Sequence, residues 1–176
     1  MKIFLALCCL IVSMQTGPSM AQFSNEHMVL EYPEDWVVRP IENTSKVNFI
    51  LETEKLSIWS PLKPDEDRKT LKLTIPSSIY YKRSPSLKKI DKELQKAAKD
   101  KLQEFEKVSS EEGSKGGVEY IKTVFTNKMG FGYETTEYYV FVIQETPYVL
   151  YMTSSRKEYI RQREVWANIW SNLSIQ

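Results

Sequence analysis

Histidine and the acidic residues are the side chains most able to do chemistry in this 176-residue chain. A Ser-His-Asp triad would have to use His27, the sole histidine, but no Gly-x-Ser-x-Gly or equivalent nucleophile turn accompanies it. Zinc and copper are normally held by several His or Cys ligands, so a single histidine does not favour either metal. The sequence therefore predicts neither a histidine-based catalytic site nor a zinc or copper site.

Three acidic clusters could supply carboxylate chemistry: Glu34-Asp35, Asp65-Glu66-Asp67 and Glu111-Glu112. The last two lack the Asp-x-Asp-x-Asp-Gly spacing with a distant Glu that wraps calcium, and we interpret them as solvated loop charge. Sugar hydrolysis needs two acids about 5 to 10 Å apart across a cleft, which adjacency along the chain does not establish. We expect Glu34-Asp35 to lie in a turn, and Trp36 to anchor the next strand in the core. We predict no catalytic, cofactor-binding or metal-binding residues, and no enzyme activity.

Two further patterns have plain structural interpretations. Gly130-Phe131-Gly132 leads into a strand, so it presents no helix N-terminus to a phosphate and indicates a hairpin turn. The tyrosine pairs Tyr80-Tyr81 and Tyr138-Tyr139 lie in extended segments, where consecutive residues point to opposite faces. Each pair should send one ring toward the core and one toward the surface or a cleft. A basic cluster comprises Lys82, Arg83, Lys88 and Lys89. We interpret it as the solvated end of a helix, in preference to a contact patch for an acidic partner.

Residues 1–21 have the features of a cleaved secretion signal. Lys2 precedes an apolar run from Ile3 to Val12, and the small residues Ser19 and Ala21 suit cleavage before Gln22. The run is about ten residues long, whereas a bilayer-spanning helix needs about 20. We therefore predict that residues 22–176 form the mature protein, a single domain in the secreted or periplasmic space.

Charge and cysteine content limit the classes of partner and the kinds of site that the predicted mature chain can have. Cys8 and Cys9 both lie in the signal, so residues 22–176 have no disulfide, thiolate metal site or cysteine nucleophile. Removing Lys2 from the 24 basic residues leaves 23, against 23 acidic residues. Nucleic acids and anionic membranes normally attract proteins with a basic excess, so both are disfavoured. We expect no nucleic-acid partner, no cofactor and no transmembrane segment in the mature chain.

Most of the mature chain has the alternating, β-branched and aromatic pattern of strands. Strands are predicted at residues 28–32, 36–38, 47–51, 56–59, 70–75, 118–126, 133–144 and 148–153. The runs 118–126 and 133–144 should form a long antiparallel hairpin. The polar, glycine-rich segment Ser109–Gly117 is predicted to be a break, and Pro147 to mark a turn.

Two stretches have helical periodicity. The first carries Leu87, Ile90, Leu94 and Phe105 on one face and has Ser86 as its predicted cap. The second begins at a Ser155-x-x-Glu158 capping box, and its apolar face includes Trp166, Ile169, Trp170 and Leu173. Because the strands follow one another as hairpins, the predicted fold class is α+β, a central antiparallel β-sheet flanked by two main helices.

This order of elements and two short motifs resemble the PsbP-like superfamily. The early motif is Tyr32-Pro33-x-x-Trp36, and the late motif, aromatic-x-x-Ile-x-x-Asn-Leu, runs from Trp166 to Leu173. The superfamily includes the extrinsic PsbP subunit of photosystem II, a Ran-binding nuclear import factor and bacterial envelope proteins such as the DcrB lipoprotein. The resemblance covers nearly all of the mature chain. It implies an antiparallel sheet with helices against it and binding of other macromolecules without catalysis, and it transfers no site residues.

Together these features predict a non-catalytic binding or accessory protein whose partner is another protein of the cell envelope or the secreted space. One alternative is a carrier of a small molecule or lipid, in which the curved sheet and a helix enclose an apolar cleft lined by tyrosines. The other alternative is a hydrolase that uses carboxylates or Ser/Thr without histidine.

Overall fold

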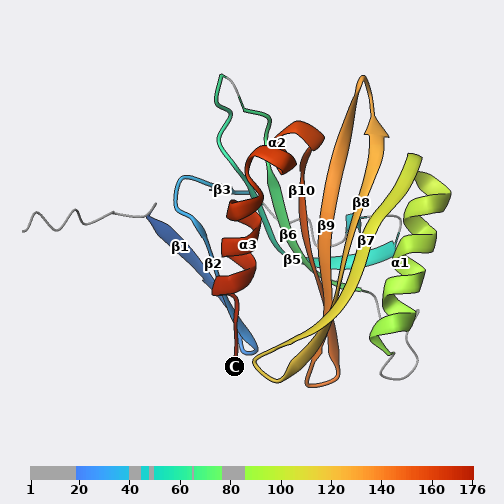
Figure 1. The fold of residues 1–176 in the computed structure, drawn as a ribbon. Helices are drawn as coiled ribbons and strands as arrows, with labels where there is room; N and C mark the ends of the chain where they lie inside the picture. The colour runs from blue at the N-terminus through green and yellow to red at the C-terminus, as the bar shows by residue number, and fades with distance from the viewer. Residues whose placement is uncertain (1–18, 40–44, 48–49, 65, 77–85) are drawn as a thin grey trace, which may run out of the picture.

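The computed structural model describes residues 19–39, 45–47, 50–64, 66–76 and 86–176 (Figure 1). The strands are β1 (Met20–Ser24), β2 (Met28–Pro33), β3 (Val37–Val38), β4 (Ser45–Val47), β5 (Ile50–Trp59), β6 (Thr70–Pro76), β7 (Gln103–Lys115), β8 (Val118–Met129), β9 (Gly132–Ile143), β10 (Thr146–Ser155) and β11 (Ser174–Ile175). The helices are α1 (Leu87–Lys101), α2 (Arg156–Arg161) and α3 (Arg163–Asn172). The described residues thus form an α+β fold dominated by antiparallel strands.

The strands form two antiparallel sheets. The small sheet has the order β1-β2-β11, and the large sheet has the order β3-β5-β6-β10-β9-β8-β7, with β4 paired to β5. In the long meander from β7 to β10, each strand pairs with the next along the chain. β10 then pairs with β6, which joins the meander to the N-terminal half of the chain.

Both faces of the large sheet are covered (Figure 1). α1 packs on one face, where Ile90 and Leu94 join a core with Phe125 and Tyr138. The other face lies under α2, α3 and the small sheet, and its core includes Leu30, Leu73, Phe141, Trp166 and Ile169. Because consecutive strand residues point to opposite faces, β9 contributes alternately to the two cores, and residues 135–141 are all buried.

A buried carboxylate fixes α1 on the sheet. Asp91 is 8% exposed, and its Oδ1 accepts hydrogen bonds from the Thr123 hydroxyl at 2.9 Å and the Tyr138 hydroxyl at 2.7 Å. Its Oδ2 accepts from the Gln95 amide at 2.6 Å, one turn along the helix. A buried carboxylate needs such partners, so this set determines how α1 lies against β8 and β9.

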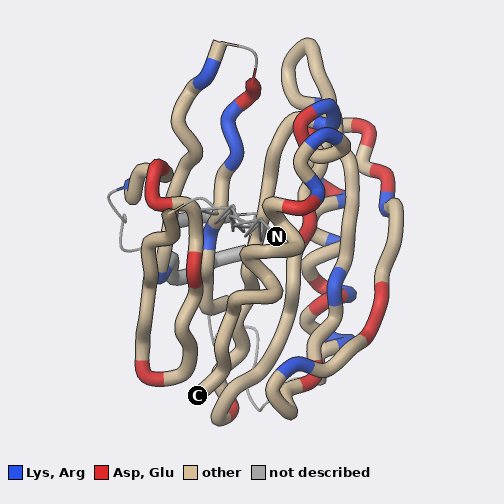
Figure 2. Tube along the Cα trace, turned by 60° about the vertical axis from the view of Figure 1, so that its left-hand side comes forward, with Lys and Arg blue, Asp and Glu red and all other residues tan. Residues whose placement is uncertain are grey.

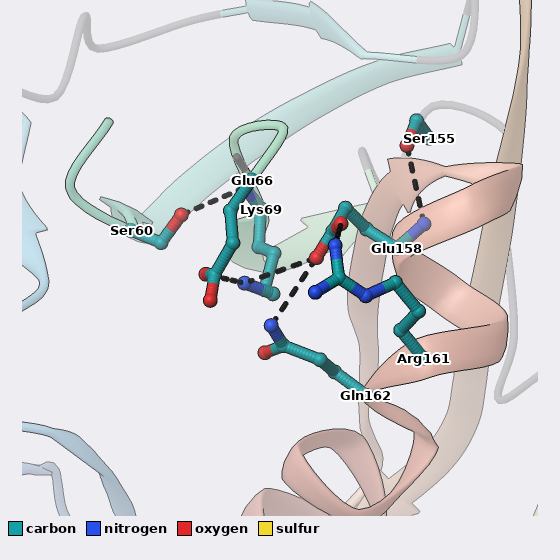
Figure 3. Close-up of polar contacts among 7 residues, drawn as sticks. All are labelled: Ser60, Glu66, Lys69, Ser155, Glu158, Arg161 and Gln162. Carbon is teal, nitrogen blue, oxygen red and sulfur yellow. Dashed lines mark hydrogen bonds and ion pairs between the residues drawn. The ribbon is translucent and has the colours of Figure 1, made fainter. Parts of the chain in front are cut away.

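A second buried polar network joins α2 to the start of β6 (Figure 3). Glu158 is 1% exposed; its carboxylate accepts from Arg161 at 3.0 Å and from Gln162 at 3.2 Å. The Lys69 ammonium, which is also buried, lies 3.8 Å from Glu158 and donates to Glu66 at 3.0 Å. This hydrogen bond from Lys69 lowers the pKa of Glu66. Glu66 is therefore an ion-paired residue of the fold and does not act as the solvated loop charge predicted for it.

Several predicted strands are confirmed. β2, β3, β6, β8 and β9 contain or closely match the predicted segments, and residues 56–59 form the end of β5. The single strand predicted for residues 47–51 is wrong, because β4 ends at Val47 and β5 begins at Ile50. Residues 48–49 and the pair Tyr80-Tyr81 lie outside the described residues, as do Lys82 and Arg83 of the basic cluster.

The largest correction concerns β7. The segment Ser109–Gly117, predicted to be a break, forms strand up to Lys115 and a tight turn at Gly116 and Gly117, whose φ values are 58° and 79°. Glu111 and Glu112 are therefore strand residues, opposite Lys122 and Ile121 of β8. β7 is the edge of the sheet, so its side chains are mostly exposed and its sequence lacks the apolar alternation that reveals a buried strand.

Three boundaries also differ from the predictions. α1 ends at Lys101, so Phe105 lies in β7, and Ser86 has the N-cap position without a side-chain capping hydrogen bond. Pro147 lies inside β10 opposite Val142; the turn before it is formed by Gln144 and Glu145, with φ values of 46° and 66°. β10 pairs with β6 only from Val149 onward. Pro147 precedes this pairing, so its lack of an N–H removes no hydrogen bond between β10 and β6.

The second predicted helix is divided into α2 and α3. The capping box is confirmed at its first residue, because the Glu158 N–H donates to the Ser155 hydroxyl at 3.3 Å. Gln162 then leaves helical geometry, with φ −127° and ψ 35°. Because of this break, α2 contacts β9 and β10, whereas α3 packs against β2.

The predicted turn after β2 is confirmed. The Trp36 N–H donates to the Pro33 carbonyl at 3.0 Å, and Glu34 and Asp35 occupy the exposed turn between them. Trp36 is 7% exposed, and its ring meets Trp166 of α3 edge-on at a centroid distance of 5.8 Å. The turn thus delivers Trp36 to the core beneath α3.

Replacing Trp36 should be costly for stability. We expect Trp36→Ala to lower the free energy of unfolding by about 3 to 5 kcal/mol, because it leaves a large cavity beside Trp166. Glu34→Gln, two residues away on the exposed turn, is the matched control and should leave stability nearly unchanged. Urea unfolding measures both, and equal midpoints for the two variants would contradict the assigned role of Trp36.

Candidate functional site

A cleft of about 330 Å³ lies between α3 and strands β7 to β9. Strand register places its sheet residues on one face, since Lys122 of β8 is opposite both Glu111 of β7 and Tyr139 of β9. Glu137 and Tyr139 are two residues apart on β9 and therefore point the same way. The helical side is contributed by Tyr159, Arg163, Glu164, Ala167, Trp170 and Ser171.

Glu137 is the most buried charged group in the cleft, at 4% exposed. Its Oε1 accepts a hydrogen bond from the Tyr139 hydroxyl at 2.7 Å, and its Oε2 accepts from the Tyr159 hydroxyl at 2.7 Å. The Lys122 ammonium lies 3.5 Å from Glu137 and 3.3 Å from Glu111. The carboxylate is thus enclosed by two phenols and a cation, which joins β9 to α2.

The two phenols act as neutral hydrogen-bond donors. Burial, and then the charge of Glu137 and the hydrogen bond to it, raise the pKa of Tyr139. Burial and the hydrogen bond to Glu137 likewise raise the pKa of Tyr159. Both side chains therefore keep their protons at neutral pH, where neither can serve as a general base or an anionic nucleophile.

An aromatic wall closes one side of the cleft. Trp170 of α3 stacks on Tyr139, with centroids 3.8 Å apart and planes at 14°, and meets Tyr120 edge-on at 4.8 Å. Tyr120 lies over Gly113 of β7 so closely that a Cβ built on Gly113 would be 2.5 Å from the phenol ring. Lys115 at the end of β7 donates to the Ser171 carbonyl at 2.8 Å. The edge strand and α3 are therefore held together around this wall.

The rim of the cleft is charged and open to solvent. Glu111, Arg163 and Glu164 are exposed, and the buried polar groups behind them are hydrogen-bonded to one another. This arrangement offers charges of both signs and aromatic edges to a bound molecule. The hydroxyl–carboxylate pairs of the cleft are those of Tyr139 and Tyr159 with Glu137, and both phenols stay protonated at neutral pH.

A second cavity, of about 850 Å³, lies on the α1 side of the sheet near the β7–β8 turn. Its apolar lining includes Leu87, Val118, Ile121 and Val142. Lys88 and Glu112, which form an exposed ion pair at 3.0 Å, also line it. No sequence pattern predicted this cavity, because its lining comes from the start of α1, the β7–β8 turn and Val142 of β9, which meet only in the folded chain.

The residues that sequence reasoning considered for chemistry are dispersed. His27 is 8% exposed; its Nε2 lies 3.4 Å from Glu26, and its ring meets Tyr148 edge-on at 6.1 Å. Among the described residues, no group of three or more His, Cys, Asp or Glu side chains is placed to hold a metal ion. Basic and acidic residues are interspersed along the described chain (Figure 2).

The pair Tyr138-Tyr139 does point to opposite faces, as predicted. Tyr138 lies in the α1-side core, and Tyr139 lines the cleft. Both rings are almost fully buried, at 1% and 2% exposed, because helices cover both faces of the sheet. Sequence reasoning missed Glu137 and Tyr159, which approach each other only when α2 folds back over β9.

The close approach of Tyr120 to Gly113 gives a direct test of the aromatic wall. Gly113→Ala should displace Tyr120 from Trp170 and lower the free energy of unfolding by about 1 to 3 kcal/mol, the usual cost of overpacking. Gly132→Ala is the matched control, because a Cβ there meets nothing within 4 Å. Thermal unfolding and near-ultraviolet circular dichroism measure the effect; a native aromatic signal in Gly113→Ala would contradict this packing.

The raised tyrosine pKa values predict a stability change at alkaline pH. Tyr139 and Tyr159 keep their protons in the folded state above about pH 10, where the unfolded chain loses them. The free energy of unfolding should therefore fall as pH rises above about 10. Tyr139→Phe and Tyr159→Phe should each reduce that slope. Phenolate absorbance of the folded protein gives a second readout, and full titration of every tyrosine near pH 10 would contradict the prediction.

Comparison with known proteins finds similarity in structure only. No protein-family model matches the sequence, and no curated protein sequence matches it significantly. Cyanobacterial PsbP (CyanoP) from Synechocystis sp. PCC 6803 is 12% identical with a TM-score of 0.64, covering 92% of this chain and 96% of CyanoP. PA94 from Pseudomonas aeruginosa, a protein of unknown function, is 11% identical with a TM-score of 0.60, covering 91% of this chain and 99% of PA94.

A third solved structure extends the same likeness. LpqN, which is involved in cell envelope biogenesis of Mycobacterium tuberculosis, is 14% identical with a TM-score of 0.56, covering 90% of this chain and 91% of LpqN. Identities this low establish the fold and leave function to be argued from the site. The described elements, their antiparallel order and these three likenesses show that the chain shares the fold of cyanobacterial PsbP.

Proposed function

We propose that this protein is a non-catalytic accessory protein that binds another protein of the cell envelope or the secreted space. Its likeness to LpqN and CyanoP extends over 90% and 92% of this chain. LpqN is itself involved in cell envelope biogenesis. The proposal places the protein outside the cytosol because residues 1–21 have the pattern of a cleaved signal.

The state of Glu137 is the observation that carries the non-catalytic part of the proposal. Both carboxylate oxygens accept hydrogen bonds from phenols that stay protonated at neutral pH. A general base must be free to reach a substrate proton, whereas this carboxylate is enclosed by Tyr139, Tyr159 and Lys122. The exposed rim residues Glu111 and Glu164 are instead available to a protein partner.

Signal removal is compatible with the small sheet. Cleavage before Gln22 would take Met20 and Ala21 from β1 and leave Gln22, Phe23 and Ser24 paired with Glu31, Leu30 and Val29. None of the helices in the described ranges has the length and apolar character needed to cross a membrane. N-terminal sequencing of the exported protein should find Gln22 at its start, and a chain retaining residues 1–21 would contradict this part of the proposal.

Site-specific photocrosslinking tests the binding role and the surface together. A photoreactive phenylalanine analogue at Glu111 or Glu164 should capture one defined protein from living cells, because these positions flank the cleft. The same analogue at Lys96, exposed on the outer side of α1, is the matched control and should capture nothing specific. The proposal fails if the cleft positions yield no product, or only the products obtained at Lys96.

The larger cavity favours a carrier of a small molecule or lipid as the second candidate. Its volume of about 850 Å³ and its apolar lining by Leu87, Ile121 and Val142 fit a ligand of that class. Native mass spectrometry of protein purified without detergent discriminates the two functions. A retained apolar ligand that is lost in Ile121→Glu would support the carrier, whereas a ligand-free mass for the wild type would support the binding protein.

A further inference from the structure

One end of the molecule carries most of its exposed large apolar side chains. This end comprises α2, the β8–β9 hairpin and the connection between β5 and β6, and it lies opposite the C-terminus (Figure 1, Figure 2). Among the described residues, eight large apolar side chains are exposed, and five belong here. They are Leu62, Met129, Phe131, Tyr133 and Ile160, and we call this end of the molecule the hairpin end.

The three segments of the hairpin end adjoin one another. A shallow cavity of about 460 Å³ is lined by Asp67 of the β5–β6 connection, by Tyr133 of β9 and by Ile160 of α2. Arg156 and Lys157, in the first turn of α2, also line it. The apolar side chains are therefore carried by neighbouring protrusions on one side of the molecule.

The hairpin holds Phe131 at its apex. Met129 pairs with Gly132, which leaves Gly130 and Phe131 as a two-residue turn. Gly130 has φ 57°, the positive value that the first central position of a type II′ turn requires. Phe131 is fully exposed, with a relative exposure of 113%. Closing this turn does not require an aromatic residue, so Phe131 adds an exposed ring to the apolar side chains gathered at this end.

Cations prevail around these apolar residues although the mature chain is balanced in charge. Two acids of this end are already paired, since Glu66 accepts from buried Lys69, and Glu104 accepts from both Lys128 and Tyr133. Among the described residues of this end, four basic side chains and two acidic ones are exposed: Lys63, Arg156, Lys157 and Arg161 against Asp67 and Glu104. The hairpin end thus combines projecting apolar side chains with a local excess of positive charge.

We propose that the hairpin end docks onto the surface of an anionic lipid bilayer. Phe131 and Met129 enter the interface between headgroups and acyl chains, and Arg156 and Lys157 contact lipid phosphates. A bilayer fits better than a protein partner because the apolar side chains stand on separate protrusions. A bilayer accepts separate apolar side chains, whereas a protein interface requires a continuous, closely packed surface. This surface is distinct from the cleft beside α3, so both can be occupied together.

Vesicle binding of residues 19–176 tests the proposal, because this range includes every described contact and omits the apolar run at Ile3–Val12. Co-sedimentation should show binding to phosphatidylcholine vesicles containing about 30% phosphatidylglycerol, and much weaker binding to pure phosphatidylcholine. The double variant Met129→Ser, Phe131→Ser should lower the partition coefficient by about tenfold or more. Val108→Ser is the matched control, since Val108 is 60% exposed on β7 away from this end.

A charge variant and a labelled variant separate docking from misfolding. Arg156→Glu with Lys157→Glu places acids in the first turn of α2, which the helix dipole favours, so the variant should fold and yet lose binding to anionic vesicles. Residues 19–176 contain no cysteine, so Phe131→Cys accepts a single environment-sensitive dye. Its emission should shift to shorter wavelength with anionic vesicles, and that of labelled Val108→Cys should not.

Three results would overturn the proposal. The first is an absence of wild-type binding to anionic vesicles. The second is equal binding by the wild type and the Met129→Ser, Phe131→Ser variant. The third is a concentration-dependent dimer that this variant abolishes while vesicles bind neither form, because a second copy of the chain would then cover Phe131 and Met129.

Discussion

Burial of the central strands on both faces is the constraint on which the rest of the structure depends. Residues 135–141 of β9 have no solvent-facing side, so each needs a partner from a helix or from the small sheet. α1 supplies that partner on one face, and α2, α3 and β2 supply it on the other. The long, aromatic meander from β7 to β10 is stable only because these segments return to cover it.

Three buried carboxylates lie at junctions between helices and sheet. Asp91 of α1 accepts from Thr123 and Tyr138, Glu137 of β9 accepts from Tyr159 of α2, and Glu158 of α2 lies beside Lys69. Apolar packing alone tolerates small shifts between layers, whereas a buried carboxylate left without its donors is heavily penalised. These contacts therefore specify where each helix lies, and the cleft beside α3 results from one of them.

The two proposed surfaces differ in the physics that would drive binding. The cleft presents paired charges and aromatic edges around hydrogen bonds that are already satisfied, which suits a specific partner with complementary charge. The hairpin end presents exposed apolar side chains beside exposed cations, which suits the surface of an anionic lipid bilayer. Together, the two proposed surfaces would place a protein partner beside a membrane.

The sequence by itself determined the α+β class, most of the strands, the turn that buries Trp36 and the cap at Ser155, because local periodicity and turn chemistry report these features. The Tyr-Pro-x-x-Trp motif forms a corner of the fold, with Glu34 and Asp35 in the turn and Trp36 in the core. Only the tertiary structure decided that Ser109–Gly117 continues an edge strand, that Gln162 divides the last helix, and that Glu137 meets Tyr159. An edge strand needs no apolar alternation, and contacts between distant segments leave no periodic trace in the chain. The candidate site consists of such contacts, so it became visible only when α2 and α3 lay over β7 to β9.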